Sequence, residues 1–345
     1  MKMEFKEILS LDSLEIGYVS RKNENILLPP LNARANSGEL IAVIGRNGIG
    51  KSTLLRTLTG LQPPLGGEIY YSGKNIRDYS RMELAQKVGY ISTEIVKVSN
   101  MSVYDLVALG RFPHTNWFGK IEPGDHDVIM DAMEKTSVKS FSGKYISELS
   151  DGERQKTMIA RILAQDTGIM IMDEPTAFLD IASKYEILHL MHTLSGNNDK
   201  TIIFSTHDFQ MAISQSDKIW LILDNKLIEG APEDLMISGA FDHLFDSSTV
   251  LFNSEDGTFS FRSDTKGSLY IEGEGNKRHW TEKAINRAGF TVSDEKSFPY
   301  IIIPSGSNKN WQLSTGTFIQ EFNSVYDLIT YLNRGESGAY LEYFL

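Results

Sequence analysis

Three short stretches of the chain lack the polar alternation of a half-exposed strand. Residues 40–44 and 169–172 are unbroken apolar runs, and residues 201–206 have an apolar centre. Such runs are typical of parallel strands that are buried on both faces. Helical patterns follow them, and the first has Leu54, Leu55 and Leu58 on one face, with Gly60 placed to end it. This alternation predicts an α/β core.

Other patterns flank this core. Residues 1–37 predict short strands, residues 81–165 are mostly helical in pattern, and residues 221–228 predict a hairpin. Within the helical region we expect a helix over about 125–136. A further helix opens at Ser150, and its buried face consists of Met158, Ile159, Ile162 and Leu163.

The tail carries a pattern of its own. Residues 249–252 and 258–261 flank the turn signal Asp256-Gly257 and predict a hairpin. Strands over 269–271 and 300–303, a helix over 279–288 and a last helix around Leu328 follow. We therefore expect a domain over 1–247 and a small α+β domain over 248–345.

Composition narrows the classes of function. The net charge of −11 argues against a nucleic-acid partner, because phosphate binding needs clustered Lys and Arg. The absence of cysteine excludes disulfides and thiolate metal sites. No run approaches the roughly 20 apolar residues that span a bilayer, so we expect no direct membrane span.

The most informative stretch follows the first apolar run. Residues 45–53 fit the phosphate-binding pattern G-x-x-x-x-G-K-[ST], between a predicted strand and a predicted helix. Glycines let backbone N–H groups curl around a phosphate, and the helix N-terminus favours negative charge. Lys51 is expected at the β- and γ-phosphates and the Ser52 hydroxyl on Mg²⁺. The ATP-binding residues we expect here are Gly45, Arg46, Asn47, Gly48, Ile49, Gly50, Lys51, Ser52 and Thr53.

Chemistry-bearing residues follow the other two runs. Asp173 and Glu174 come directly after residues 169–172, and His207 follows residues 201–206. Because parallel strands bring such ends to one edge of the sheet, these side chains are expected near the phosphate loop. Tyr18 has two interpretations: its ring stacks on the adenine base, or it packs on its own sheet.

These motifs, in this order, resemble the ATP-binding subunit of ABC transporters over roughly residues 8–245. Residues 45–53 match the Walker A loop, residues 149–155 the signature motif and residues 169–174 the Walker B strand. Asp180 falls on the D-loop and His207 on the switch histidine. The resemblance implies a P-loop NTPase with a RecA-like parallel sheet, an antiparallel β subdomain and a helical subdomain over about 93–165. Beyond about residue 248 it stops.

The resemblance also implies roles. Glu174 is the general base for water, His207 contacts the γ-phosphate, and Asp173 with Ser52 holds Mg²⁺. The signature residues Ser150, Asp151, Gly152 and Glu153 act on the ATP of the opposite subunit of a homodimer. The cofactors implied are ATP and Mg²⁺.

At two places the sequence differs from the motifs of this family, and both differences bear on the rate of ATP turnover and on ATP affinity. Thr93 occupies the Q-loop position where the family usually has glutamine. Either Glu94 beside it substitutes as an oxygen ligand, or the contact runs through water. The signature reads LSDGE, so Asp151 and Glu153 replace the usual Gly and Gln. Asp151 weakens the grip on a γ-phosphate unless it points away or pairs with a cation.

Residues 106–114 and 163–167 resemble the import ATPases for iron–siderophore, haem and vitamin B12 permeases. This implies a peripheral protein at the cytoplasmic face of the inner membrane. Its partners are two integral-membrane permease subunits and, through them, a substrate-binding protein. The alternatives are a soluble ABC ATPase outside transport and an ATP-sensing cassette with weak turnover.

Overall fold

The structure is a computed structural model of the chain. It describes residues 6–20, 23–93, 100–115, 120–198, 200–244, 250–253, 257–261, 265–305 and 309–334. The chain divides into two compact units, Met1–Asp246 and Ser247–Leu345, and each is described by itself.

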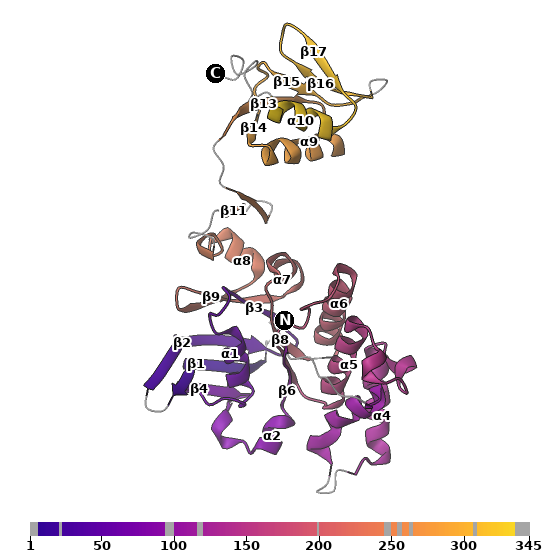
Figure 1. Ribbon diagram of the computed structural model, residues 1–345. Helices are drawn as coiled ribbons and strands as arrows, with labels where there is room; N and C mark the ends of the chain where they lie inside the picture. The colour runs from indigo at the N-terminus through magenta and orange to yellow at the C-terminus, as the bar shows by residue number, and fades with distance from the viewer. Residues whose placement is uncertain are drawn as a thin grey trace, which may run out of the picture. The chain divides into compact units, whose positions relative to one another are not determined.

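The first unit is built on a six-stranded sheet in the order β10-β9-β3-β8-β7-β6 (Figure 1). All neighbouring pairs are parallel except β9 and β10, which form the predicted hairpin. The strands are β3 (Leu40–Gly45), β6 (Val88–Ile91), β7 (Ile169–Met172), β8 (Thr201–Ser205), β9 (Lys218–Leu223) and β10 (Lys226–Gly230). β6 lies inside the region that the pattern assigned mostly to helix, because four residues are too few to show a period against their helical surroundings.

A second, antiparallel sheet has the order β2-β1-β4-β5. Its strands are β1 (Glu7–Ser20), β2 (Asn23–Asn36), β4 (Gly66–Tyr71) and β5 (Lys74–Asn75). The expectation of short strands was wrong, since β1 and β2 have 14 residues each. Register shifts interrupt β1, and Ser13 has a positive φ of 49° inside one of them. A bulge shifts the alternation of side chains, so one long strand has the pattern of two short ones.

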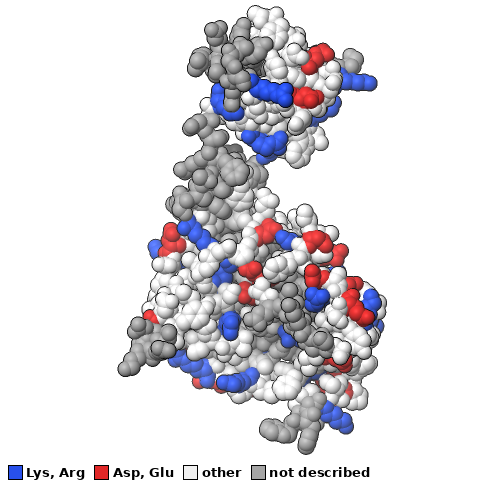
Figure 2. Space-filling model, viewed as in Figure 1, with Lys and Arg blue, Asp and Glu red and all other residues white. Residues whose placement is uncertain are grey.

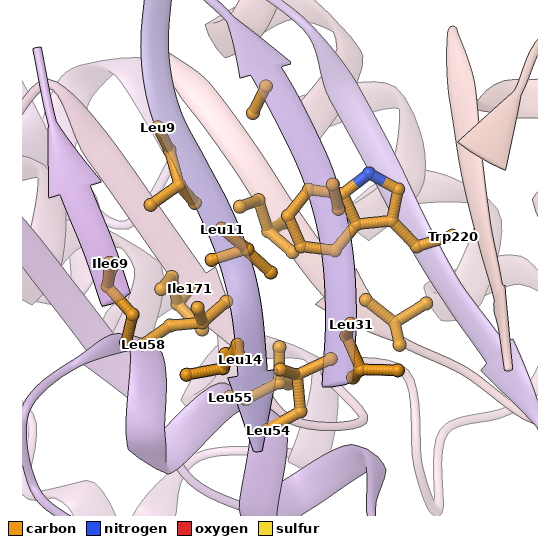
Figure 3. Packing of buried hydrophobic residues seen from close by; sticks show 14 of the residues in the cluster. Leu9, Leu11, Leu14, Leu31, Leu54, Leu55, Leu58, Ile69, Ile171 and Trp220 are labelled. Atoms are coloured by element: carbon orange, nitrogen blue, oxygen red, sulfur yellow. The ribbon is translucent and has the colours of Figure 1, made fainter. Parts of the chain in front are cut away.

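The core of the first unit lies between these two sheets (Figure 3). Helix α1 (Lys51–Leu58) follows β3 and contributes Leu54, Leu55 and Leu58, none of which is exposed. Leu14 of β1 and Ile171 of β7 belong to the same cluster. Because α1 is held in the core, the loop that precedes it is fixed at both ends.

Helices cover other parts of the large sheet. α6 (Ile181–Asn198) packs against β3 and β8, and α7 (Phe209–Gln215) packs against β3. α8 (Pro232–Ile237) and the 3₁₀ turn η5 (Asp242–Leu244) follow β10. The remaining short elements are η1 (Ile76–Asp78), η3 (Lys139–Phe141) and η4 (Ile146–Glu148).

The helical part of the unit packs around α5 (Asp151–Ala164), which contacts α3 and α4. Its other elements are α2 (Arg81–Ala85), α3 (Val103–Ala108), η2 (Leu109–His114) and α4 (Pro123–Lys135). Pro123 is the first residue of α4, where its missing N–H costs no hydrogen bond. Arg111 ties these elements together, because its Nε donates to Asp125 at 2.8 Å and its Nη1 to the Ala164 carbonyl at 2.9 Å.

The second unit contains a hairpin and a five-stranded sheet in the order β14-β13-β15-β16-β17. The predicted hairpin is formed by β11 (Val250–Asn253) and β12 (Thr258–Phe261). The other elements are β13 (Gly267–Glu272), α9 (Asn276–Arg287), β14 (Phe290–Ser293), β15 (Tyr300–Ile302), β16 (Trp311–Ser314), β17 (Ile319–Phe322) and α10 (Val325–Arg334). β14, β16 and β17 have no counterpart in the sequence prediction. α9 and α10 pack on the sheet over a core of their own that includes Leu269, Ile285, Ile301 and Leu328.

Among the described residues no helix combines the length and apolarity needed to cross a bilayer. In the view of Figure 2, basic and acidic side chains are interspersed over the surface. In this view neither sign of charge gathers into one large patch.

Candidate nucleotide-binding and catalytic site

The site is a cleft of about 360 Å³ at the carboxyl edge of the parallel sheet. It brings together residues from the first antiparallel strands, the phosphate loop and the loops after β7 and β8. They are Tyr18, Leu27, Asn47, Gly48, Gly50, Lys51, Ser52, Thr53, Glu174 and His207. Six of them come from the motif at residues 45–53, so the motif and the expected edge of the sheet coincide in space.

The phosphate loop connects β3 to α1 through two residues with left-handed backbone. Gly48 has φ 76° and Gly50 has φ 110°, conformations that side chains other than glycine rarely adopt. Gly50 is the N-cap of α1, and its carbonyl accepts the N–H of Leu54 at 2.8 Å. The loop therefore presents backbone N–H groups and the positive end of α1 to the cleft.

Lys51 holds its ammonium group inside this loop. Nζ donates to the carbonyls of Gly45 at 2.9 Å and Arg46 at 3.2 Å. Desolvation by burial lowers the pKa of Lys51, and the nearby carboxylates of Glu174 and Asp173 oppose that shift. A phosphate group entering the cleft supplies further negative charge that favours the protonated amine.

Tyr18 stands at the rim of the cleft with half of its surface exposed. Its hydroxyl lies 2.7 Å from Oγ1 of Thr53, so α1 holds the phenol and the ring remains on the cleft side. This placement leaves the ring available to a base, as in the first of the two interpretations of Tyr18.

Asp173 and Glu174 lie directly after β7, and Ser205 of the neighbouring strand β8 binds both of them. Asp173 is 5% exposed and accepts the Ser205 hydroxyl at 2.6 Å. The N–H of Glu174 donates to the same hydroxyl at 2.9 Å, and Glu174 has a positive φ of 50°. The Glu174 carboxylate contacts Nε2 of His207. Two expected functional residues thus meet directly, across neighbouring strands.

Thr93 lies just after β6 and contacts the same strand end. Its hydroxyl donates to the carbonyl of Asp173 at 3.2 Å. Glu94, its proposed companion, lies outside the described residues.

The signature residues open α5 and do not line the nucleotide cleft. Ser150 caps the helix: its N–H and hydroxyl both donate to the Glu153 carboxylate, at 2.8 and 2.9 Å. These bonds lower the pKa of Glu153. Asp151 forms an ion pair with Arg154 at 2.7 Å. Arg154 is thus a cation of the kind that offsets the negative charge of Asp151 beside a bound phosphate. Ser150 and Gly152 are not among the described residues that line the cleft with Lys51.

Asp180 begins α6 beside the signature helix. Its carboxylate accepts the N–H of Ser183 at 2.8 Å, and hydrogen bonds from this turn lower the pKa of Asp180. A Cβ added at Gly152 comes within 3.0 Å of Oγ of Ser183. The lack of a side chain at Gly152 therefore permits α5 and the start of α6 to approach closely.

Sequence reasoning missed Ser205. The signal was present, because Ser205 is a polar residue at the end of an apolar strand, immediately before Thr206 and His207. Its importance becomes visible only in the sheet, where Phe204 of β8 pairs with Met172 of β7 and places Ser205 beside Asp173.

A glycine-rich phosphate loop, a buried carboxylate pair and a histidine at one edge of a parallel sheet define a nucleoside-triphosphate hydrolase. Residues 28–177 match the family model described as ABC transporter. The probable siderophore transport system ATP-binding protein of Bacillus subtilis is 32% identical to this chain over 69% of the chain and 85% of its own length. The protein belongs to the ATP-binding proteins of ABC transporters and is an ATPase.

Two further comparisons extend this result. The ferric enterobactin transport ATP-binding protein of Escherichia coli is 32% identical, covering 68% of this chain and 85% of its own length. A solved structure described as an inward-facing conformation of a putative metal-chelate type ABC transporter is similar with a TM-score of 0.61 and 27% identity, covering 74% of this chain and 95% of that one. The tail, where the motif resemblance stopped, also matches: residues 266–333 fit a model described as Iron ABC transporter C-terminal domain.

Proposed function

We propose that the protein is the ATP-hydrolysing subunit of an importer for ferric siderophores, with haem and cobalamin as the alternative cargoes. The observation that carries the proposal is the presence, in one chain, of an ABC nucleotide cleft and a tail that fits an iron-transport domain. The names of the relatives, which refer to siderophore and ferric enterobactin transport, support the same cargo.

The cleft supplies the charge stabilisation that phosphoryl transfer needs. Phosphate oxygens meet the N–H groups of the glycine-rich loop and the ammonium of Lys51, which exchanges its carbonyl partners for phosphate. Ser52 and Asp173 fit Mg²⁺, since this ion takes hard oxygen ligands from one or two protein groups and from substrate phosphates. When bound, Mg²⁺ neutralises charge that develops on the β- and γ-phosphates.

Glu174 is the base in this proposal. Its carboxylate lies beside the cleft, and its backbone is fixed by Ser205. It orients a water molecule against the γ-phosphate and takes a proton from that water as the new P–O bond forms. The bond between the γ-phosphorus and the β–γ bridging oxygen breaks, and ADP leaves. His207 contacts Glu174 and lines the same cleft, so it holds the carboxylate in place and reaches the γ-phosphate.

The separation of the signature from the cleft supports a homodimer in which ATP lies between two copies. Ser150 and Gly152 of one copy then face the γ-phosphate held by Lys51 of the other. The Asp151–Arg154 pair reduces the charge that this surface carries toward the phosphate. Closing and opening of such a dimer is the motion that drives two permease subunits and, through them, uptake from a substrate-binding protein.

The permease side is proposed on the helical part of the unit. Leu109 is 52% exposed and Phe112 63% exposed, on the segment that resembles import ATPases. Gln86 at the end of α2 donates to the carbonyl of Pro113 at 2.8 Å, which fixes this segment against α2. Docking there places the protein at the cytoplasmic face of the inner membrane.

The test combines uptake and hydrolysis. Cells lacking this gene are given the wild-type chain or Glu174→Gln, and uptake of a radioactive ferric siderophore is measured. We expect uptake with the wild type only, while purified Glu174→Gln binds ATP and releases no phosphate in steady state. Normal siderophore uptake in the deleted cells would contradict the cargo, and undiminished phosphate release by Glu174→Gln would remove Glu174 from the role of base.

A further inference from the structure

Arg46 of the phosphate loop makes hydrogen bonds in two directions, through its backbone carbonyl and through its side chain. The carbonyl of Arg46 accepts Lys51 Nζ at 3.2 Å on the inner side of the loop. On the outer side its guanidinium donates to the carbonyl of Leu244, from Nη2 at 3.1 Å and from Nε at 3.3 Å. Arg46 thus connects the lysine of the cleft to a segment about 200 residues further along the chain.

That segment, residues 239–244, is the last described part of the first unit. Leu244 is 9% exposed and Phe241 is fully buried. After Asp246 the chain enters the second unit. The first unit therefore ends against its own phosphate loop, and the second unit continues from that end.

The same segment also packs against the first residue of the helix that follows His207. The ring of Phe241 meets the ring of Phe209 edge to face, with centroids 4.7 Å apart. Phe209 is the first residue of α7 and lies two residues after His207, whose side chain contacts Glu174. Residues 239–244 thus contact both Arg46, whose carbonyl binds Lys51, and Phe209, which begins the helix after His207.

We infer that Arg46 is a positioning residue that couples the conformation of the phosphate loop to residues 239–244, and through them to the C-terminal unit. When nucleotide draws Lys51 away from the Arg46 carbonyl, the loop adjusts, and the fork between Arg46 and Leu244 transmits that change to the end of the first unit. Coupling is reciprocal, so a state of the second unit that moves Leu244 changes nucleotide affinity. This inference needs only nucleotide binding and is independent of the cargo.

Hydrogen exchange of the full chain tests the inference. Amide exchange is followed with Mg²⁺ and a non-hydrolysable ATP analogue, at a concentration that titration shows to saturate each variant. In the wild type we expect the analogue to change exchange over residues 239–244 and in the hairpin of β11 and β12 by about fivefold or more. In Arg46→Met the analogue still changes exchange in α1, but the change in those two segments is lost.

Two variants complete the design. Arg46→Lys keeps the charge but not the two-donor fork, so we expect it to behave as Arg46→Met. Arg56→Met removes an exposed arginine from the last turn of α1 and is expected to behave as the wild type. The same nucleotide effect on residues 239–244 in Arg46→Met, or no effect in the wild type, would overturn the coupling.

Discussion

The hydroxyl of Ser205 donates a hydrogen bond to the carboxylate of Asp173, with 2.6 Å between Oγ and Oδ1. The same oxygen accepts the N–H of Glu174, so one buried hydroxyl on β8 orients two consecutive acids at the end of β7. Ser205 is fully buried, and its bond to Asp173 sets the direction of a carboxylate proposed to hold Mg²⁺. Partners of this kind often matter nearly as much as the ligands themselves.

We predict that Ser205→Ala lowers the hydrolysis rate by about 10-fold to 100-fold and raises the Mg²⁺ concentration needed for half-maximal rate. The physical reason is that Asp173 and the backbone of Glu174 lose their shared partner. Ser195→Ala is the matched control, because Ser195 is also buried but donates to the carbonyl of His192 in α6. Equal effects of the two substitutions on rate and Mg²⁺ dependence would assign Ser205 a packing role only.

Arg111→Met should destabilise the first unit. It removes the cation from a pair whose members are each 9% exposed, which leaves the Asp125 carboxylate without its charged partner. Breaking such a pair costs about 3–5 kcal/mol of the free energy of unfolding. The control Lys139→Met breaks an exposed pair with Glu134 and should cost under about 1 kcal/mol. Denaturant unfolding, followed through the transition of the first unit, measures both; similar losses would contradict the prediction.

The pair of Arg111 and Asp125 should also make the free energy of unfolding depend on pH. A backbone hydrogen bond from Glu122, then the guanidinium of Arg111, lowers the pKa of Asp125 below its ordinary value. A lowered pKa in the folded state stabilises the fold above the unfolded pKa, and this contribution is lost as pH falls through the folded pKa. We therefore expect the difference in unfolding free energy between wild type and Arg111→Met to shrink below about pH 4. A difference that stays constant down to pH 2 or so would exclude the charged pair as its source.

The sequence predicts much of this architecture, because the apolar runs that mark the buried strands also mark where the site residues begin. Buried parallel strands require apolar runs, and their ends carry the chemistry, so Gly45, Asp173 and His207 were found together with their strands. Ser205 and the fork between Arg46 and Leu244 were not predictable. They depend on the order of strands in the sheet and on contacts between segments far apart in the chain, which a local pattern does not contain. The bulges of β1 and the strand β6 were not predicted either, because of their local patterns. The bulges shift the alternation of side chains in β1, and the four residues of β6 are too few to show a period.

A mixture of two inactive chains should recover hydrolysis if ATP binds between two copies. Ser150→Arg spoils the signature, and Lys51→Ala spoils the phosphate loop, so only the heterodimer has one intact composite site. With random pairing and one active site in each heterodimer, activity should reach roughly a quarter of the wild-type rate. Each mutant alone is the control, and light scattering with ATP reports whether the mixture associates. A mixture that forms dimers but stays inactive would contradict the shared site.

The last prediction concerns the second unit. The two units have separate hydrophobic cores, and every residue of the nucleotide cleft lies in the first. A chain of residues 1–246 keeps Leu244 and its bond to Arg46. We therefore expect this chain to fold, to melt cooperatively, and to retain ATP binding and basal hydrolysis.

What should change on truncation is dimerisation or the transport-coupled rate. An autonomous unit without a catalytic group acts through contacts with its own cassette, a second copy or a partner. Solution mass with ATP, basal hydrolysis and siderophore uptake are compared between residues 1–246 and the full chain. A truncated protein that exposes apolar surface and shows no cooperative melt would place the second unit in the folding core of the first. Equal mass, hydrolysis and uptake in both chains would deny the second unit a role in dimerisation or in coupling.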